Sequence, residues 1–190
     1  MPNITIFASG AGSNAREIIR YFRNHTSVKV VLIVSNKPEA GVLTVAKDAG
    51  LPTLLIEKDR FFRGDGYVSE LKEAKTDLVV LAGFLWKIPP AVVAAFPQHI
   101  INIHPSLLPL YGGKGMYGAH VHQAVIGDGQ KQSGITIHYV DNEYDHGQKI
   151  FQALCDVDTT DSAETLATKI HKLEHEYFPQ VIEQLLQKQA

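Results

Sequence analysis

An asparagine and a histidine two residues apart offer the clearest chemistry in the sequence. Asn102 and His104 lie in the segment NIHPSLLP, at the end of a short apolar run. Residues i and i+2 of an extended strand point to the same side, so we expect the amide and the imidazole to be neighbours. An amide can stabilise a developing oxyanion, and an imidazole moves a proton near neutral pH. The pair therefore predicts acyl chemistry.

A second candidate site lies near the N-terminus, in the stretch ASGAGSNA. Its G-x-G-x-x-A spacing matches the outline of a dinucleotide-binding turn, and Gly10 and Gly12 permit backbone angles that other residues avoid. Ser13 and Asn14 are suitable N-cap residues, and their side chains can also donate to phosphate oxygens. A dinucleotide site further needs an acidic residue at the end of the second strand, whereas this chain has SNK at 35–37. A single phosphate monoester at the helix start is the better prediction.

Alternating strands and helices must position these residues. Short apolar runs predict strands at 3–7, 28–35, 52–57, 76–84 and 99–104, and helical 3–4 spacing predicts helices at 15–22, 39–50, 67–74 and 91–96. This alternation indicates a parallel sheet that is covered by helices. In such a sheet, ligands bind beyond the carboxyl ends of the strands, where the glycine loop and the segments 83–89 and 102–109 meet.

The second half of the chain departs from this alternation. A Pro/Gly-rich loop at 105–118 precedes a helix at 119–129, two strands at 133–140 and 148–157 that suit antiparallel pairing, and a long amphipathic helix from Ser162. A structureless loop of that length in a compact domain is usually functional. We therefore expect one α/β domain over 1–190, Rossmann-like and doubly wound. Its mostly parallel sheet should end in an antiparallel C-terminal portion followed by a long C-terminal helix.

Composition limits the possible partners and the compartment. The formal net charge is −2, from 18 basic and 20 acidic residues, so we expect neither nucleic acid nor a membrane as a partner. Cys155 is the only cysteine, which excludes a disulfide framework and fits a reducing cytoplasm. The N-terminus lacks the charged region and cleavage site of a signal peptide. These features predict an unprocessed cytoplasmic protein.

Three segments together resemble the folate-dependent formyltransferases. They are GSN at 12–14, NIHPSLLP at 102–109 and GITIHYVDNEYDHG at 134–147, in the order and spacing of that family. The resemblance extends over essentially the whole chain. Within the family, the chain resembles the members that act on glycinamide ribonucleotide well. It implies transfer of the formyl group of 10-formyltetrahydrofolate to the amine of N1-(5-phospho-D-ribosyl)glycinamide, a step of de novo purine biosynthesis.

The resemblance also implies roles for individual residues. His104 corresponds to the general acid and base, Asn102 to the group that holds the formyl oxygen, and Asp145 to a carboxylate that raises the pKa of His104 and positions a water. Transfer is direct in this family, so neither an enzyme nucleophile nor a metal is required.

Substrate and folate contacts carry over in the same way. The family's ribonucleotide contacts fall on Gly12, Ser13, Asn14 and Glu174. Its folate contacts fall on Leu85, Trp86, Lys87, Ile88, Asn102, Asp141, Glu143 and Arg63, with backbone groups reading the pterin. Trp86 stands where many members have a basic residue, Asn142 stands where an acid is usual, and the loop at 110–119 is longer than the common form.

Several alternatives remain beside this prediction. A formyltetrahydrofolate hydrolase shares the catalytic trio and uses water as acceptor, but that family has an additional N-terminal domain. A methionyl-tRNA formyltransferase has an additional C-terminal domain, and a non-catalytic nucleotide-binding module would not need the trio. HKLEH at 171–175 fits an inverted zinc-protease motif, yet we expect an ordinary helix face and no metal. His138 suits an active-site or a structural role equally well, and a monomer and a homodimer are both compatible with the sequence.

Overall fold

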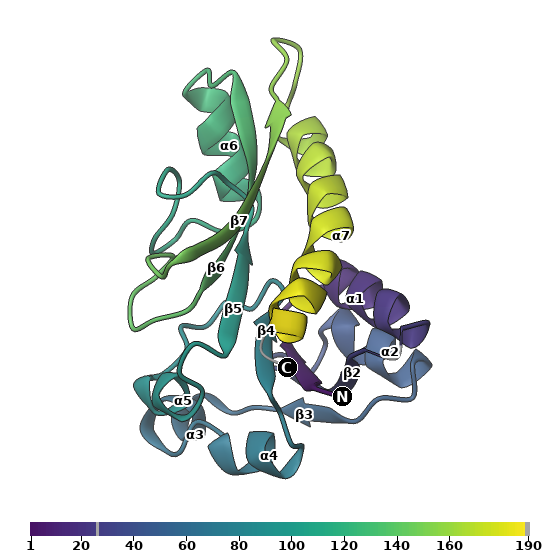
Figure 1. Cartoon of the computed structure of the whole chain (residues 1–190). Coiled ribbons are helices and arrows are strands. Elements are labelled where there is room, and N and C mark those ends of the chain that lie inside the picture. Colours follow the sequence, from purple (N-terminus) through teal and green to yellow (C-terminus); the bar gives the residue numbers. More distant parts are fainter. Residues whose placement is uncertain (26, 189–190) are drawn as a thin grey trace.

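A computed structural model describes residues 1–25 and 27–188. In this part of the chain, seven strands form one sheet in the order β3-β2-β1-β4-β5-β6-β7 (Figure 1). The strands are β1 (Asn3–Phe7), β2 (Lys29–Ser35), β3 (Thr53–Leu55), β4 (Leu78–Leu81), β5 (Ile100–His104), β6 (Gln132–Tyr139) and β7 (Lys149–Asp156). The first five are parallel, whereas β6 runs antiparallel to both β5 and β7. The predicted fold class is confirmed.

Helices cover both faces of the parallel part of the sheet (Figure 1). They are α1 (Ser13–Arg23), α2 (Gly41–Asp48), α3 (Lys58–Arg63), α4 (Val68–Glu73), α5 (Pro90–Ala95), α6 (Ala119–Gly127) and α7 (Ala163–Lys188). The helix α3 was not expected from the sequence. It has six residues, of which only Phe61 is buried, so it is too short to establish a 3.6-residue pattern.

Side-chain alternation along the strands divides the core into two clusters. Ile4 and Ile6 of β1 belong to a cluster with buried residues of α1, α2, α6 and α7. Phe7 belongs to the other cluster, together with Phe61 of α3 and Val92 of α5. Because the parallel strands are buried on both faces, they read as nearly continuous apolar runs in the sequence.

The order of the strands reverses beside β1, and this reversal creates the site. The chain proceeds from β1 to β2 and β3 on one side, then returns to β4 and β5 on the other. Connections therefore diverge at the carboxyl ends of β1 and β4 and leave a crevice there. The Ser9 hydroxyl spans this end of the sheet, since it donates to Asn36 Oδ1 at 2.6 Å and accepts the Leu85 N–H at 2.9 Å.

Among residues 1–25 and 27–188, no helix combines the length and the apolar character needed to cross a bilayer.

Candidate active site

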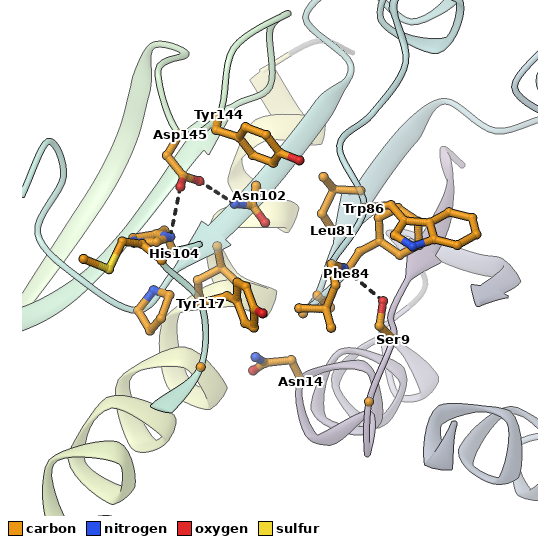
Figure 2. A pocket seen from close by; sticks show the side chains of 18 of the residues that line it. Ser9, Asn14, Leu81, Phe84, Trp86, Asn102, His104, Tyr117, Tyr144 and Asp145 are labelled. Atoms are coloured by element: carbon orange, nitrogen blue, oxygen red, sulfur yellow. Dashed lines mark hydrogen bonds and ion pairs between the residues drawn. The ribbon is translucent and has the colours of Figure 1, made fainter. Parts of the chain in front are cut away.

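A cavity of about 790 Å³ opens at the carboxyl ends of β1, β4 and β5 (Figure 2). Its walls come from the loops after these strands, from the segment 113–118, and from the turn between β6 and β7. The helices α6 and α7 add His122, His171 and Glu174. The volume falls in the range of small-molecule sites. The three segments expected to meet do so.

Gly12 shapes the loop that follows β1. Its φ of 77° lies in the left-handed region, and a Cβ atom at this position would stand 2.8 Å from the Cα of Val42. α1 begins directly afterwards at Ser13, so the N–H groups of its first turn have no helical partner. This is the arrangement expected for an anion site.

Two details of the predicted loop were wrong. Gly10 has no positive φ and open space beside it, so Gly12 alone requires glycine in this turn. The N-cap residue is Gly12 itself, and no side chain caps the helix. Ser13 and Asn14 therefore lie inside the first turn, where their backbone N–H groups become the donors.

Asn14 connects this loop to the C-terminal helix. Its Nδ2 donates to Glu174 Oε2 at 3.0 Å, and Oε2 also lies 2.9 Å from Nδ1 of His171. Glu174 is 5% exposed, and its hydrogen bond raises the pKa of His171 above the ordinary value. The structure thus brings Asn14 and Glu174 together, as their predicted roles in binding one ligand require.

The predicted catalytic trio also comes together. Asn102 and His104 extend from β5 on the same side, and Asp145 approaches from the turn between β6 and β7 (Figure 2). Asp145 Oδ2 lies 3.6 Å from His104 Nδ1, and Asp145 Oδ1 lies 3.5 Å from Asn102 Nδ2. Asp145 has a φ of 54°, and Gly113 donates its N–H to Oδ2 at 2.9 Å. This hydrogen bond helps to hold an uncommon backbone conformation in place.

A backbone carbonyl selects the tautomer of His104. The imidazole Nε2 lies 2.7 Å from the carbonyl oxygen of Tyr111, which can only accept, so Nε2 bears the proton. In the neutral ring, Nδ1 is then an unprotonated base that faces Asp145. A proton taken up at Nδ1 produces an imidazolium beside a carboxylate.

Burial and two neighbouring groups act on the pKa of His104 in opposite directions. Burial lowers it most, while Asp145 and the Tyr111 carbonyl raise it, and the balance lies below the ordinary 6.5. Asp145 raises the pKa of His104, as expected, but burial lowers it further because His104 is only 3% exposed. Burial raises the pKa of Asp145, but the neighbouring His138 and His104 and the Gly113 N–H lower it by more, so Asp145 remains a carboxylate. His104 is therefore neutral at pH 7 and ready to accept a proton.

His138 is part of the same cluster and lines the cavity, so it faces the site rather than the core behind it. It pairs with Asn102 across β5 and β6 and donates from Nδ1 to the Tyr139 carbonyl at 2.8 Å. Its Nε2 therefore accepts the Asn102 Nδ2–H at 3.1 Å and lies 3.6 Å from Asp145 Oδ1. Both N–H bonds of Asn102 are thus engaged, and Figure 2 shows its oxygen turned away from Asp145.

Aromatic and basic side chains line the other end of the cavity. Trp86 lies against Phe61 and Phe62, with ring centres 5.7 and 5.5 Å away, and Lys87 Nζ lies 5.4 Å from the ring centre of Tyr144. Leu85, Trp86, Lys87, Ile88, Asp141 and Glu143 all line the cavity. The Leu85 N–H is already bonded to Ser9, so it is not free to read a ligand.

Arg63 is the predicted site residue that the structure does not bring to the others. Its side chain is 84% exposed on α3, 3.8 Å from Asp59, and is not part of the cavity wall. Conversely, Lys37 and His122 line the cavity although neither was predicted. The sequence contained a signal that Lys37 lies near the site. It follows the second strand at the position where a dinucleotide site would have a carboxylate.

The zinc-protease motif forms an ordinary contact between neighbouring turns of α7. His171 and Glu174 are paired as described above, and residues 1–25 and 27–188 contain no cluster of three His, Cys, Asp or Glu that could hold a metal ion.

Comparison with known proteins identifies the class to which this fold and site belong. The formyl transferase family matches residues 2–182, and the chain belongs to this family.

Individual relatives point to one kind of member. The chain is 40% identical over 185 residues to phosphoribosylglycinamide formyltransferase, chloroplastic, of Arabidopsis thaliana, covering 94% of this chain and 63% of that protein. It is 35% identical to the phosphoribosylglycinamide formyltransferase of Bacillus subtilis (strain 168), covering 98% of this chain and 95% of that protein. The crystal structure of phosphoribosylglycinamide formyltransferase from Bacillus halodurans has a TM-score of 0.89 at 35% identity, covering 99% of this chain and 97% of that one. The chain spans 63% and 61% of the length of the two plant relatives.

Proposed function

We propose that this chain transfers the formyl group of 10-formyltetrahydrofolate to the amine of N1-(5-phospho-D-ribosyl)glycinamide. The observation that carries the proposal is the His104 imidazole, whose Nε2 is bonded to a carbonyl and whose Nδ1 faces a carboxylate and the cavity. The names of the relatives support this choice of substrates.

Each end of the cavity suits one substrate. The N-terminus of α1, with Gly12, Ser13 and Asn14, favours the phosphate of the ribonucleotide, and Glu174 suits its ribose hydroxyls. The apolar wall around Trp86 and Leu85 suits the flat ring system of the folate. The two substrates then meet beside Asn102 and His104.

The reaction proceeds by direct attack. The amine nitrogen forms a bond to the formyl carbon, and the formyl oxygen becomes an oxyanion. His104 Nδ1 takes the proton that the attacking nitrogen loses, and the resulting cation is stabilised by Asp145. As the bond from carbon to N10 breaks, His104 returns that proton to N10. The products are the formylated amide and tetrahydrofolate, so no metal and no covalent enzyme intermediate are needed.

Asn102 is the proposed donor to the oxyanion. Its Nδ2 contact with Asp145 is 3.5 Å long, against 3.1 Å for the contact with His138. The longer contact is the weaker one. The Asn102 N–H that points to Asp145 is therefore the one that turns to donate to the formyl oxygen as negative charge develops there.

The proposal has a direct test. Purified protein is mixed with both substrates, and tetrahydrofolate and the formylated ribonucleotide are measured separately. We expect both products in equal amounts and no folate product when the amine is omitted. Equal folate turnover without the amine indicates a hydrolase, and binding of the ribonucleotide without any turnover indicates a non-catalytic module. A cytoplasmic location, which Cys155 as the only cysteine favours, belongs to the same proposal.

A further inference from the structure

His122 is the buried titratable group in the cavity wall that the mechanism above does not use. It lies on α6, is 3% exposed and lines the cavity. Its Nδ1 is enclosed by the protein and has no hydrogen-bond partner. Buried polar groups usually have partners, so an unpartnered imidazole in a cavity wall requires an explanation.

His122 shares the cavity wall with both ends of the proposed ribonucleotide site, and its helix α6 packs against α7, which carries Glu174. Burial lowers the pKa of His122 most, and the charges of His171, Glu174 and His104 also act on it. Glu174 is bonded to Asn14 of the phosphate loop, whereas His104 is the proposed acid and base. Asn14, His104, His122 and Glu174 all line one cavity, so a ligand that extends from Asn14 to His104 can contact His122.

We propose that His122 positions the glycinamide arm of the ribonucleotide by a hydrogen bond to its amide. The inference rests on the proposed function. Between the ribose, which is assigned to Glu174, and the reacting amine, which is assigned to His104, the substrate has one further polar group, and this group is the amide.

The surroundings of the ring select its donor atom. Nδ1 is enclosed, so Nε2 is the ring nitrogen that can reach a ligand in the cavity. Burial keeps the ring neutral, so it bears a single proton. An enclosed N–H without a partner is rarer than an enclosed acceptor without one. The proton therefore lies on Nε2, which donates to the carbonyl oxygen of the amide and orients the arm toward His104.

Two ligands that differ only in the arm test this inference. We would measure kcat/KM for glycinamide ribonucleotide, KM for the formyl donor and the Kd of ribose 5-phosphate, which has no amide. His122→Ala should lower kcat/KM for the ribonucleotide roughly 10-fold. The KM for the formyl donor and the Kd of ribose 5-phosphate should change less than about twofold, because neither molecule forms the hydrogen bond to His122. His122→Gln, whose amide nitrogen can occupy the place of Nε2, should recover most of this loss.

His120→Ala is the matched control, because His120 is an exposed residue of the same helix outside the cavity wall. The inference is overturned if His122→Ala weakens ribose 5-phosphate binding as much as it lowers kcat/KM for the ribonucleotide. It is also overturned if His122→Ala leaves kcat/KM unchanged, or if His122→Gln has a kcat/KM no higher than that of His122→Ala. If His122→Ala does not fold, His122→Gln and His122→Asn are compared instead, and equal constants for these two overturn it. A wild-type protein that forms no formylated ribonucleotide contradicts the proposed function itself.

Discussion

The N–H of Gly113 donates to Asp145 Oδ2 at 2.9 Å and thereby joins the long loop after β5 to the turn between β6 and β7. The same oxygen lies 3.6 Å from His104 Nδ1. The loop also supplies the Tyr111 carbonyl that holds Nε2 of the same ring. One irregular segment therefore determines the tautomer of the imidazole and the place of its carboxylate.

The trio should be essential for turnover. In the proposed mechanism, His104→Ala removes the group that moves the proton, and Asp145→Asn removes the charge that stabilises the resulting cation. Each change should lower kcat about 100-fold or more, which is the scale of positioned acid–base catalysis. Steady-state kinetics with both substrates measures this effect. Near-normal rates in both variants would remove the assigned mechanism.

The pH dependence of the reaction should follow His104. The neutral ring is the base in the proposed mechanism, so activity should be lost as pH falls through its pKa, which lies below the ordinary 6.5. Asp145 raises this pKa, so Asp145→Asn should shift the acid limb of kcat/KM to still lower pH. Asp59→Asn, a change on the exposed surface of α3, should leave the limb in place. A limb that does not move in Asp145→Asn contradicts the assignment of His104.

Gly12 should be necessary for the stability of the loop. Gly12→Ala forces a side chain into a left-handed conformation and against Val42, which we expect to cost about 1–3 kcal/mol of unfolding free energy. Gly10→Ala is the matched control, because open space surrounds that position, and it should change stability by less than about 1 kcal/mol. Urea unfolding of both variants measures the difference. Equal effects would show that the close approach of α2 has no energetic consequence.

Thr136 should anchor the long loop. Its buried hydroxyl donates to the Ser106 carbonyl and accepts from the Leu108 N–H and from Gln152. Thr136→Val keeps the shape but leaves these groups unpaired, so we expect a loss of about 1–3 kcal/mol in thermal or urea unfolding. Ser133→Ala on the same strand removes a buried hydroxyl without a partner and should be neutral or stabilising. An equal loss in both variants would contradict this account.

Trp86 should report folate binding. It is the only tryptophan, and it lines the cavity at the end assigned to the folate. A folate ring system that docks there displaces water from the indole, so its fluorescence should change in a saturable titration. Ribose 5-phosphate, which is assigned to the opposite end, should have little effect. Equal changes with both ligands, or none with the folate, would place the folate elsewhere.

Local sequence patterns predicted the features that depend on residues close together in the sequence, namely the strands and the directions of their side chains. The two-residue spacing of Asn102 and His104 was enough to bring their side chains together, because β5 is a regular strand. The alternation of apolar runs likewise predicted every strand of the sheet and the reversal of direction at its C-terminal portion. Both inferences need only the periodicity of regular secondary structure.

Features that depend on contacts distant in sequence could not be predicted in this way. The role of His138 follows from its register against Asn102, which no local pattern reveals. The tautomer and the low pKa of His104 depend on burial and on the Tyr111 carbonyl. Arg63 belongs to a helix too short to be recognised, so its direction could not be inferred. Gly12 rather than Gly10 is critical because α2 packs there.

The pairing of β5 with β6 restricts how this protein can change in length. His138 lies opposite Asn102, and Thr136 lies opposite His104. An insertion or deletion of one residue between β6 positions 132 and 136 would turn these side chains to the other face of the sheet, unless a bulge absorbed it. The His138 imidazole would leave Asp145, and the Thr136 hydroxyl would no longer bond the loop after β5. Variation in length is therefore compatible with the site only in pairs of residues within this strand, or in the loops that flank it.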